Sequence, residues 1–126
     1  MRYMFLIYSR EGAFAAAAAE DVQKLINGHW AVMDETKEKG VFVAADPLQP
    51  TATATTVRSQ DGKPLVLDGP FAETKEQLAG YYIIDCRNLD EAIEWAKKIP
   101  TSCRGGEGCI EIRPLPGLPS RPPANG

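Results

Sequence analysis

The order of apolar and polar residues along this chain predicts strands at three places. Residues 2–8 are apolar at both sets of alternate positions, as in a strand covered on two faces. Residues 79–85 have the same pattern. In residues 108–113 isoleucines alternate with charged side chains, as in a strand at the edge of a sheet. We therefore expect residues 2–8 to form a central strand and residues 108–113 an edge strand.

Apolar residues at spacings of three and four predict two helices. The first runs from about Ala17 to Lys39 and ends at Gly40, because glycine readily adopts a left-handed conformation. The second begins at Asn88, a favourable N-cap residue, and stops at Pro100. The apolar stripe of the first helix comprises Val22, Leu25, Ile26, His29 and Met33. That of the second comprises Leu89, Ala92, Ile93, Ala96 and Ile99.

Shorter elements are predicted between the two helices. A strand is expected over Val41 to Ala45, and a hairpin over Ala52 to Arg58 and Leu65 to Asp68 around the Asp61-Gly62 turn. Residues 71–78 form either a short helix or an ordered loop. The resulting order is β–α–β–hairpin–β–α–β.

This order predicts an α+β fold with a ferredoxin-like antiparallel sheet and both helices on one face. The expected domain spans residues 1–115, and residues 116–126 form a proline-rich, flexible tail. On the other face of the sheet, each large apolar side chain left in water forfeits roughly 1.5–3 kcal/mol. A second copy of the chain would cover that face, so we expect a homodimer of the dimeric α/β-barrel kind.

Composition and charge exclude several partners. The chain has 14 basic and 17 acidic residues in 126, a formal net charge of −3, and no stripe of one sign that could follow a nucleic acid. No apolar run approaches the roughly 20 residues of a membrane span, and no export signal precedes the first strand, so we expect a cytoplasmic protein without membrane contact. Cys86, Cys103 and Cys109 are scattered and predict reduced thiols. Neither a metal-ligand cluster nor a glycine-rich phosphate loop is present, so we expect no metal and no cofactor.

The most distinctive segment is DGPFAETKEQLAGYYIID at residues 68–85. It places an acid at a strand end, then a Gly-Pro bend, a phenylalanine and several charges before a buried strand. This segment resembles the DGPF signature of the YCII-related family. The resemblance continues through PTATATTVR at 50–58, LDEAIEWAKKIP at 89–100 and IEIRPL at 110–115, and it covers nearly all of residues 1–115.

The resemblance implies a ferredoxin-like protomer, a dimeric barrel and a small cleft between the sheet and its helices. Related dimeric barrels include muconolactone isomerase, small monooxygenases and a chlorohydroquinone dehydrochlorinase. Members of the family are also often encoded beside, or fused to, extracytoplasmic-function sigma factors, which implies a regulatory setting. A fold that hosts such varied activities does not by itself determine a function.

His29, the single histidine, is the leading candidate for acid/base chemistry. Its place on the apolar stripe points it toward the sheet, where a partly dry site can bring the imidazole pKa near neutrality. Its distance from Gly40 resembles the histidine-to-glycine spacing of the broader YCII family, whose histidine is a proposed active-site residue. The position of the family's partner aspartate is occupied here by Ile99. The alternative is a histidine hydrogen-bonded within the core or an interface.

Asp68 is the candidate partner of His29, since a carboxylate at a strand end beside a bend can reach a cleft and orient an imidazole. The alternative is a turn aspartate that accepts backbone N–H groups. Arg58, on the opposite hairpin strand, is a candidate to pair with Asp68 or to bind a substrate carboxylate. Its alternative is a solvated strand arginine.

Further candidates for substrate contact lie in and after the bend. Phe71 can anchor the bend, and Glu73 and Lys75 are candidates for proton transfer or anion binding. As an alternative, the charged residues form local ion pairs worth about 0–1 kcal/mol each. Tyr82 and its neighbour Tyr81 lie on opposite faces of one strand, one toward the helices and one toward the dimer interface. Each either packs or donates its phenol to a ligand.

Two functional hypotheses follow. The first is a cofactor-free lyase or isomerase acting on a hydroxylated or carboxylated ring, with His29 as proton shuttle, Asp68 orienting it and Arg58 binding an anion. The second is a non-catalytic ligand-binding or regulatory module linked to a sigma factor. A third hypothesis, a purely structural dimer, gives the family motif only a stabilising role.

Overall fold

The main sheet is antiparallel and has four strands in the order β2-β5-β1-β6. The computed structural model describes residues 1–10, 12–101 and 107–124. The central strands β1 and β5 are flanked by β2 and β6, so β1 is central and β6 is an edge strand, as the sequence predicts. The four strands are β1 (Arg2–Arg10), β2 (Phe42–Pro47), β5 (Glu76–Asp85) and β6 (Gly108–Leu115).

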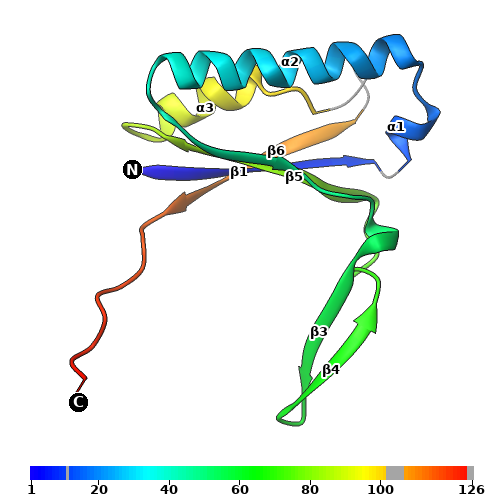
Figure 1. Cartoon of the computed structure of the whole chain (residues 1–126), viewed down its shortest axis with the longest axis vertical. Helices are drawn as coiled ribbons and strands as arrows, with labels where there is room; N and C mark the ends of the chain where they lie inside the picture. Colours follow the sequence, from blue (N-terminus) through cyan, green and yellow to red (C-terminus); the bar gives the residue numbers. More distant parts are fainter. Residues whose placement is uncertain (11, 102–106, 125–126) are drawn as a thin grey trace.

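The helices lie on one face of this sheet. In the described ranges they are α1 (Ala13–Ala16), α2 (Ala19–Glu38) and α3 (Leu89–Lys98), with a 3₁₀ turn, η1, at Thr51–Thr53. Figure 1 shows α2 and α3 together on one side of the four strands. The arrangement confirms the predicted ferredoxin-like α+β fold. None of these helices is long and apolar enough to cross a membrane.

The predicted hairpin forms a separate two-stranded sheet of β3 (Thr55–Gln60) and β4 (Lys63–Asp68). Its turn uses Asp61 and Gly62, both with positive φ, as the Asp-Gly signal predicts. Figure 1 shows this hairpin, which we call the arm, extending away from the main sheet on the side opposite the helices.

The hydrophobic core lies between the sheet and its helices. Alternate side chains of β1 and β5 face the helices and are buried, because successive residues of a strand point to opposite faces. Phe5 and Ile84 are almost completely inaccessible at the centre of this layer. The core also includes Tyr3, Ile7, Val32, Tyr82, Cys86, Ala92, Trp95 and Ile99.

The opposite face of the sheet, which we call the open face, carries the other alternate residues of β1 and β5. They are Met4, Leu6, Tyr8, Tyr81 and Ile83, each partly exposed. The two phenols reach polar groups at the rim: the Tyr8 hydroxyl donates to Glu111 at 3.2 Å and the Tyr81 hydroxyl donates to Asp46 at 3.0 Å. No described helix lies over this face (Figure 1).

The sheet-facing stripe of α2 differs from the prediction. The residues that face the sheet follow one another at spacings of four, three and four, and they are Leu25, His29, Val32 and Thr36. Ile26, in contrast, is 41% exposed. Thr36 tolerates burial because its hydroxyl donates to the carbonyls of the preceding turn. The predicted place of Ile26 on the buried stripe is therefore wrong, since one step along a helix rotates a side chain by about 100°.

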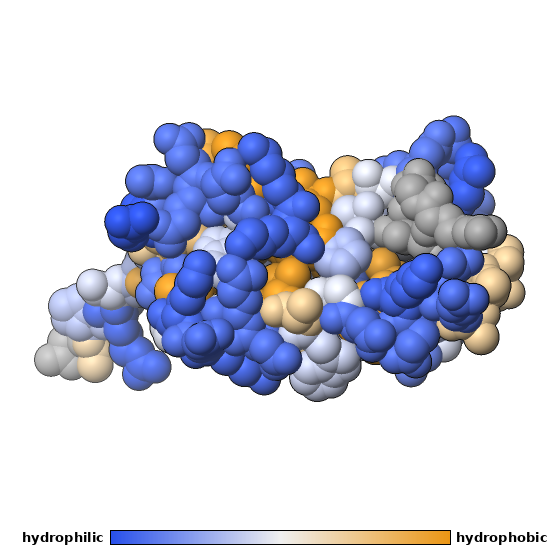
Figure 2. Space-filling model, turned by 90° about the horizontal axis from the view of Figure 1, so that it is seen from above, coloured by the Kyte–Doolittle hydropathy of each residue, from blue (hydrophilic) through white to orange (hydrophobic). Residues whose placement is uncertain are grey.

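The two tryptophans have opposite environments. Trp30 is 54% exposed on α2, with the Lys37 ammonium 6.0 Å from the centre of its ring. Trp95 is instead buried in the core, while Leu89 and Ile93 of its predicted stripe are exposed. Figure 2 shows the surface from the helix side. Most of this surface is hydrophilic, and hydrophobic residues are visible mainly in the gaps between the hydrophilic side chains.

The segment after the Gly-Pro bend is an ordered loop rather than a helix. β5 begins at Glu76, three residues before its predicted start. Glu76, Gln77 and Leu78 extend the strand because they pair with Arg10, Ser9 and Tyr8 of β1, which is itself longer than predicted. After β6, residues 116–124 run away from the sheet and are exposed (Figure 1).

The N-terminus of α3 provides a test of the sequence-encoded fold. The Asn88 side chain accepts a hydrogen bond from the backbone N–H of Glu91 at 2.9 Å. Asn88→Ala removes this acceptor and is expected to lower the free energy of unfolding by about 1 kcal/mol, measured by urea denaturation. Asn88→Asp keeps an acceptor and should cost much less. Equal losses in the two variants would contradict the capping role.

Candidate functional site

His29 and Tyr82 meet in the layer between α2 and the sheet. His29 Nδ1 lies 2.6 Å from the Tyr82 hydroxyl, and the two rings pack edge to face with centroids 5.8 Å apart. The same hydroxyl lies 3.4 Å from the backbone carbonyl of His29. α2 supplies the histidine on its sheet-facing side, and the alternation of β5 turns Tyr82, but not Tyr81, toward it.

Burial keeps both groups of this pair neutral near pH 7. It lowers the pKa of His29 below its ordinary value of 6.5, because the imidazolium would lose hydration. It raises the pKa of Tyr82 to about 12 for the same reason. The pair is therefore a hydrogen bond between an uncharged imidazole and an uncharged phenol. Such a pair can hold the ring in one orientation or relay a proton.

His29 Nε2 has a different environment from Nδ1. Every buried side-chain nitrogen or oxygen of the described residues has a hydrogen-bond partner, and no bond joins Nε2 to any of these residues. Nδ1 is therefore the ring nitrogen that these residues hold, and Nε2 is the one left to contact a ligand or exchange a proton.

The structure does not bring Asp68 to His29. Asp68 is exposed at the end of β4, in the arm on the other side of the sheet from α2, and the imidazole is bonded to Tyr82 instead. The predicted pairing of these two residues is wrong within one chain, because the hairpin that carries Asp68 leaves the sheet rather than folding under the helices.

The predicted pairing of Arg58 with Asp68 is also wrong. Arg58 is opposite Leu65 in the arm and Asp68 is opposite Thr55, so the two side chains lie on opposite faces of the hairpin. The Arg58 guanidinium instead donates to the backbone carbonyl of Phe71 at 3.1 Å. This contact ties the arm to the bend that follows it.

Three of the remaining predicted contact residues lie in the loop at the base of the arm, namely Phe71, Glu73 and Lys75. Phe71 is 77% exposed, so it does not anchor the bend by burial. Glu73 and Lys75 are exposed and make no hydrogen bond or ion pair with other described residues. Tyr82 lies far from this loop, beneath α2. The predicted site therefore divides between two places, the base of the arm and the interior layer.

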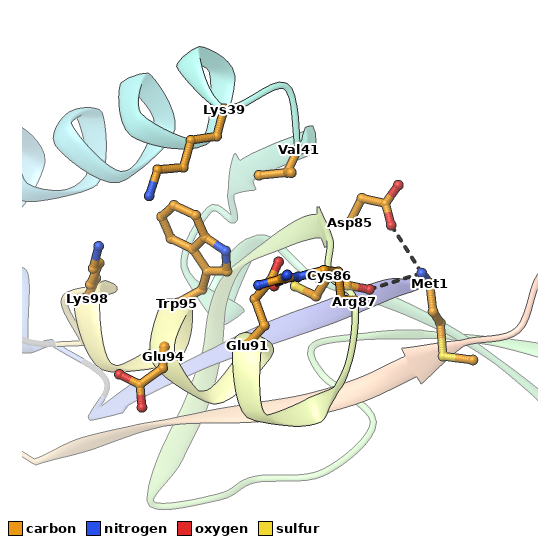
Figure 3. Close-up of a pocket in the computed structure, with 10 residues that line it drawn as sticks. All are labelled: Met1, Lys39, Val41, Asp85, Cys86, Arg87, Glu91, Glu94, Trp95 and Lys98. Atoms are coloured by element: carbon orange, nitrogen blue, oxygen red, sulfur yellow. Dashed lines mark hydrogen bonds and ion pairs between the residues drawn. The ribbon is translucent and has the colours of Figure 1, made fainter.

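A cleft of about 580 Å³ lies where α2 ends and α3 begins, beside the end of β5. Figure 3 shows it with the side chains of Lys39 and Lys98 beside the Trp95 indole. Its volume is in the range typical of small-molecule sites. It is lined by Met1, Lys39, Val41, Asp85, Cys86, Arg87, Glu91, Glu94, Trp95 and Lys98.

Trp95 and two lysines form the most distinctive part of this cleft. The ammonium groups of Lys39 and Lys98 lie 5.2 and 4.9 Å from the indole ring. Both lysines share one carboxylate, Glu35, at 3.4 and 2.7 Å. The pKa of Glu35 is lowered, first by the hydrogen bond from Lys98, so the carboxylate stays charged. Two ammonium groups and one carboxylate leave a net positive charge beside an aromatic ring.

The opposite wall of the cleft contains paired charges. The N-terminal ammonium donates to the Asp85 carboxylate at 3.2 Å and to the Cys86 carbonyl at 3.0 Å (Figure 3). The Arg87 side chain donates to Glu91 at 2.6 Å. Burial raises the pKa of the Cys86 thiol to about 11, which makes it a poor nucleophile near pH 7.

The other cysteines fit a binding site no better. Cys109 is an exposed free thiol on β6, and its pKa is raised by desolvation and by Glu76. Cys103 lies outside the described residues. Within the described ranges, no three histidine, cysteine or acidic side chains gather where they could hold a metal ion.

Comparison with known proteins identifies the family of this chain. The YCII-related domain matches residues 1–116. An uncharacterised protein of Rhizobium meliloti (strain 1021) is 40% identical over 115 residues, which are 91% of this chain and 92% of that protein. The chain belongs to the YCII-related family.

The cleft of this YCII-related protein was not found from its sequence. Lys39 follows α2, whereas Trp95 and Lys98 belong to α3, and no short motif links them. The one available signal is the resemblance over residues 89–100, which includes both α3 residues. The sequence alone does not indicate that Lys39 lies against Trp95.

The His29–Tyr82 pair of this YCII-related protein predicts a specific pH dependence. The folded pKa of His29 lies below the unfolded value, so as pH falls below about 6.5 the unfolded chain binds the proton first. Stability should therefore decrease from that pH down to the folded pKa and level off below it. Urea unfolding across this pH range should show the decrease, and His29→Gln should remove it.

NMR gives a direct check of the same pKa. The chemical shifts of the carbon-bound protons of the imidazole should change with pH, with a midpoint below pH 6.5 in the folded protein. In Tyr82→Phe the imidazole loses its hydroxyl partner but stays in the same layer, so its pKa should stay low. A midpoint at or above 6.5 in the wild-type protein would contradict control by burial.

Proposed function

We propose that this YCII-related protein is a small-molecule-binding module whose ligand is a carboxylated ring. The ligand occupies the cleft beside Trp95, with its carboxylate between Lys39 and Lys98. The observation that carries the proposal is the pair of ammonium groups 5.2 and 4.9 Å from one indole in a cleft of about 580 Å³.

The chemistry of the cleft supports this ligand class. A carboxylate accepts charge-assisted hydrogen bonds from ammonium groups, and such bonds are roughly twice as strong as neutral ones. Because Lys39 and Lys98 share the single carboxylate of Glu35, a second anion can be accommodated without an excess of negative charge. Val41 and the small exposed part of Trp95, which is 6% exposed, supply the apolar side of the cleft.

A binding function is favoured over a catalytic one by the acid/base residues. His29 has a neutral phenol as its partner rather than a carboxylate, and Asp68 lies in the arm. The cofactor-free lyase or isomerase is the second candidate. The observation in its favour is the short 2.6 Å contact that fixes the imidazole through Nδ1 and leaves Nε2 without a partner among the described residues. The sigma-factor link is a prediction from the family resemblance and fits the binding module.

The cleft can be tested with benzoate and salicylate as probes. In ¹⁵N-labelled protein, either acid should shift the indole N–H resonance of Trp95, which Trp30→Phe distinguishes from that of Trp30. Lys98→Gln removes a charged donor and should weaken binding at least about tenfold. Lys97→Gln is the matched control, because this neighbouring lysine pairs with Glu94 at 2.9 Å and does not line the cleft.

The same samples distinguish binding from catalysis. Probe that is bound but chemically unchanged, as seen in the ligand's own NMR spectrum, supports the binding module. Conversion that His29→Ala abolishes would support the enzyme and contradict our proposal. Equal binding by Lys98→Gln and Lys97→Gln would exclude the cleft as the site.

We also propose that the protein acts as a homodimer in which two open faces pack together. The support is the row of large side chains on β1 and β5 that faces away from the helices. Covering such a surface with an identical one is the usual solution of a symmetric dimer.

Light scattering tests the dimer. The wild-type chain should have the mass of two chains at micromolar concentration. Leu6→Glu places two carboxylates at the centre of the face and should raise the dimer dissociation constant at least about 100-fold. Ile26→Glu, on the outward side of α2, is the control and should leave the mass unchanged. A wild-type mass of one chain would refute the proposal.

A further inference from the structure

The arm has little support from its own chain. All its strand residues except Thr56 are exposed, and β3 and β4 pack mainly against each other. Val57 and Val66 face one another across the two strands and are 65% and 67% exposed. A two-stranded hairpin alone is at best marginally stable in water.

The arm is apolar on both of its faces. Its register places Val57 and Val66 on one face, and Leu65 and Leu67 on the other beside Arg58 and Thr56. Both leucines are 40% exposed. An ordinary solvated hairpin keeps polar residues on its outer face, so this pattern is typical of a hairpin that packs against another surface.

The base of the arm is a fixed elbow rather than a loose linker. Thr56 donates its hydroxyl to the Gly69 carbonyl at 2.7 Å, and the Gly69 N–H donates to the Ala54 carbonyl at 2.7 Å. Arg58 donates to the Phe71 carbonyl at 3.1 Å. Gly69 has φ 98°, a conformation that residues with a Cβ rarely adopt. These contacts hold the arm away from its own sheet.

The direction and length of the arm match a second copy of the chain. Figure 1 shows the arm extending on the side of the open face. Six residues per strand at about 3.3 Å each make it about 20 Å long. Sheets packed face to face lie about 10 Å apart, so the arm extends past the plane of a partner sheet.

The area required for a stable dimer points to the same partner. Two facing four-stranded sheets of this size cover about 1,000 Å² in total, slightly less than the 1,200–2,000 Å² of stable interfaces. Two arms, each laid along the other protomer, add about 800 Å². The dimer then reaches the usual range.

We propose that the arm of each protomer docks along the flank of a second copy of this chain, so that two arms clasp the dimer. This inference rests on the proposed homodimer and assigns a role to the DGPF segment. Asp68 to Phe71 forms the elbow that directs the arm to the partner. The docking surface is the face of the arm that carries Val57 and Val66.

Hydrogen exchange measured against protein concentration tests the clasp. At concentrations where light scattering gives two chains, the amides of β3 and β4 should be protected. On dilution to the monomer they should exchange at least about tenfold faster, because the free hairpin opens readily. The amides of β1 that pair within the main sheet are the internal reference and should change much less.

Variants of the arm test the same contact by affinity. Val57→Ser with Val66→Ser should raise the dimer dissociation constant at least about tenfold, since two apolar side chains are lost from each docked arm. The matched control is Thr55→Ser with Ser59→Thr, which alters the same face of the hairpin but removes no apolar residue that the proposal uses.

The outcomes separate the clasp from the dimer itself. A wild-type protein that is monomeric at all concentrations refutes both proposals. A stable dimer whose arm exchanges freely, or whose affinity is unaffected by the Val57 and Val66 changes, refutes the clasp alone. Protection of the arm in the monomer also refutes the clasp, since the arm would then dock on its own chain.

Discussion

Burial of the two central strands is the constraint on which the rest of the structure depends. β1 and β5 carry large side chains on both faces, because successive residues of a strand point in opposite directions. On one face Phe5 and Ile84 pack under the helices and form the core. On the other face the described part of the chain supplies no helix. That asymmetry underlies both the dimer and the clasp that we propose.

The same packing determines where chemistry can occur. Because α2 covers the sheet closely, His29 is held by Tyr82 and made neutral by burial rather than placed beside a carboxylate. The hollow forms instead beyond the end of α2, between Lys39 and one side of α3. The DGPF segment lies at neither place. It forms the elbow of the arm, so in this protein we assign the family motif to assembly rather than to acid/base chemistry.

Local sequence patterns predicted the positions of helices and strands well. They predicted less well which residues of a helix face the sheet. The predictions of the central strand β1, the Asp61-Gly62 turn and the Asn88 cap were all correct, because each depends on neighbours within a few residues. The stripe of α2 was misjudged at Ile26, since apolar character alone does not decide which of two adjacent helical positions faces the sheet. Thr36, a polar residue, took the buried position because its hydroxyl bonds to its own helix.

The sequence by itself determined the family, the ferredoxin-like order of elements and the two-sided apolar character of the central strands, because these follow from local patterns and one long motif. Only the tertiary structure decided which side chains meet. It separated His29 from Asp68, placed Arg58 and Asp68 on opposite faces of one hairpin, and brought Lys39 to Trp95, 56 positions further along the chain. Such long-range contacts depend on the direction in which a hairpin leaves the sheet and on the place where a helix ends relative to its neighbours. No local sequence pattern encodes either of these.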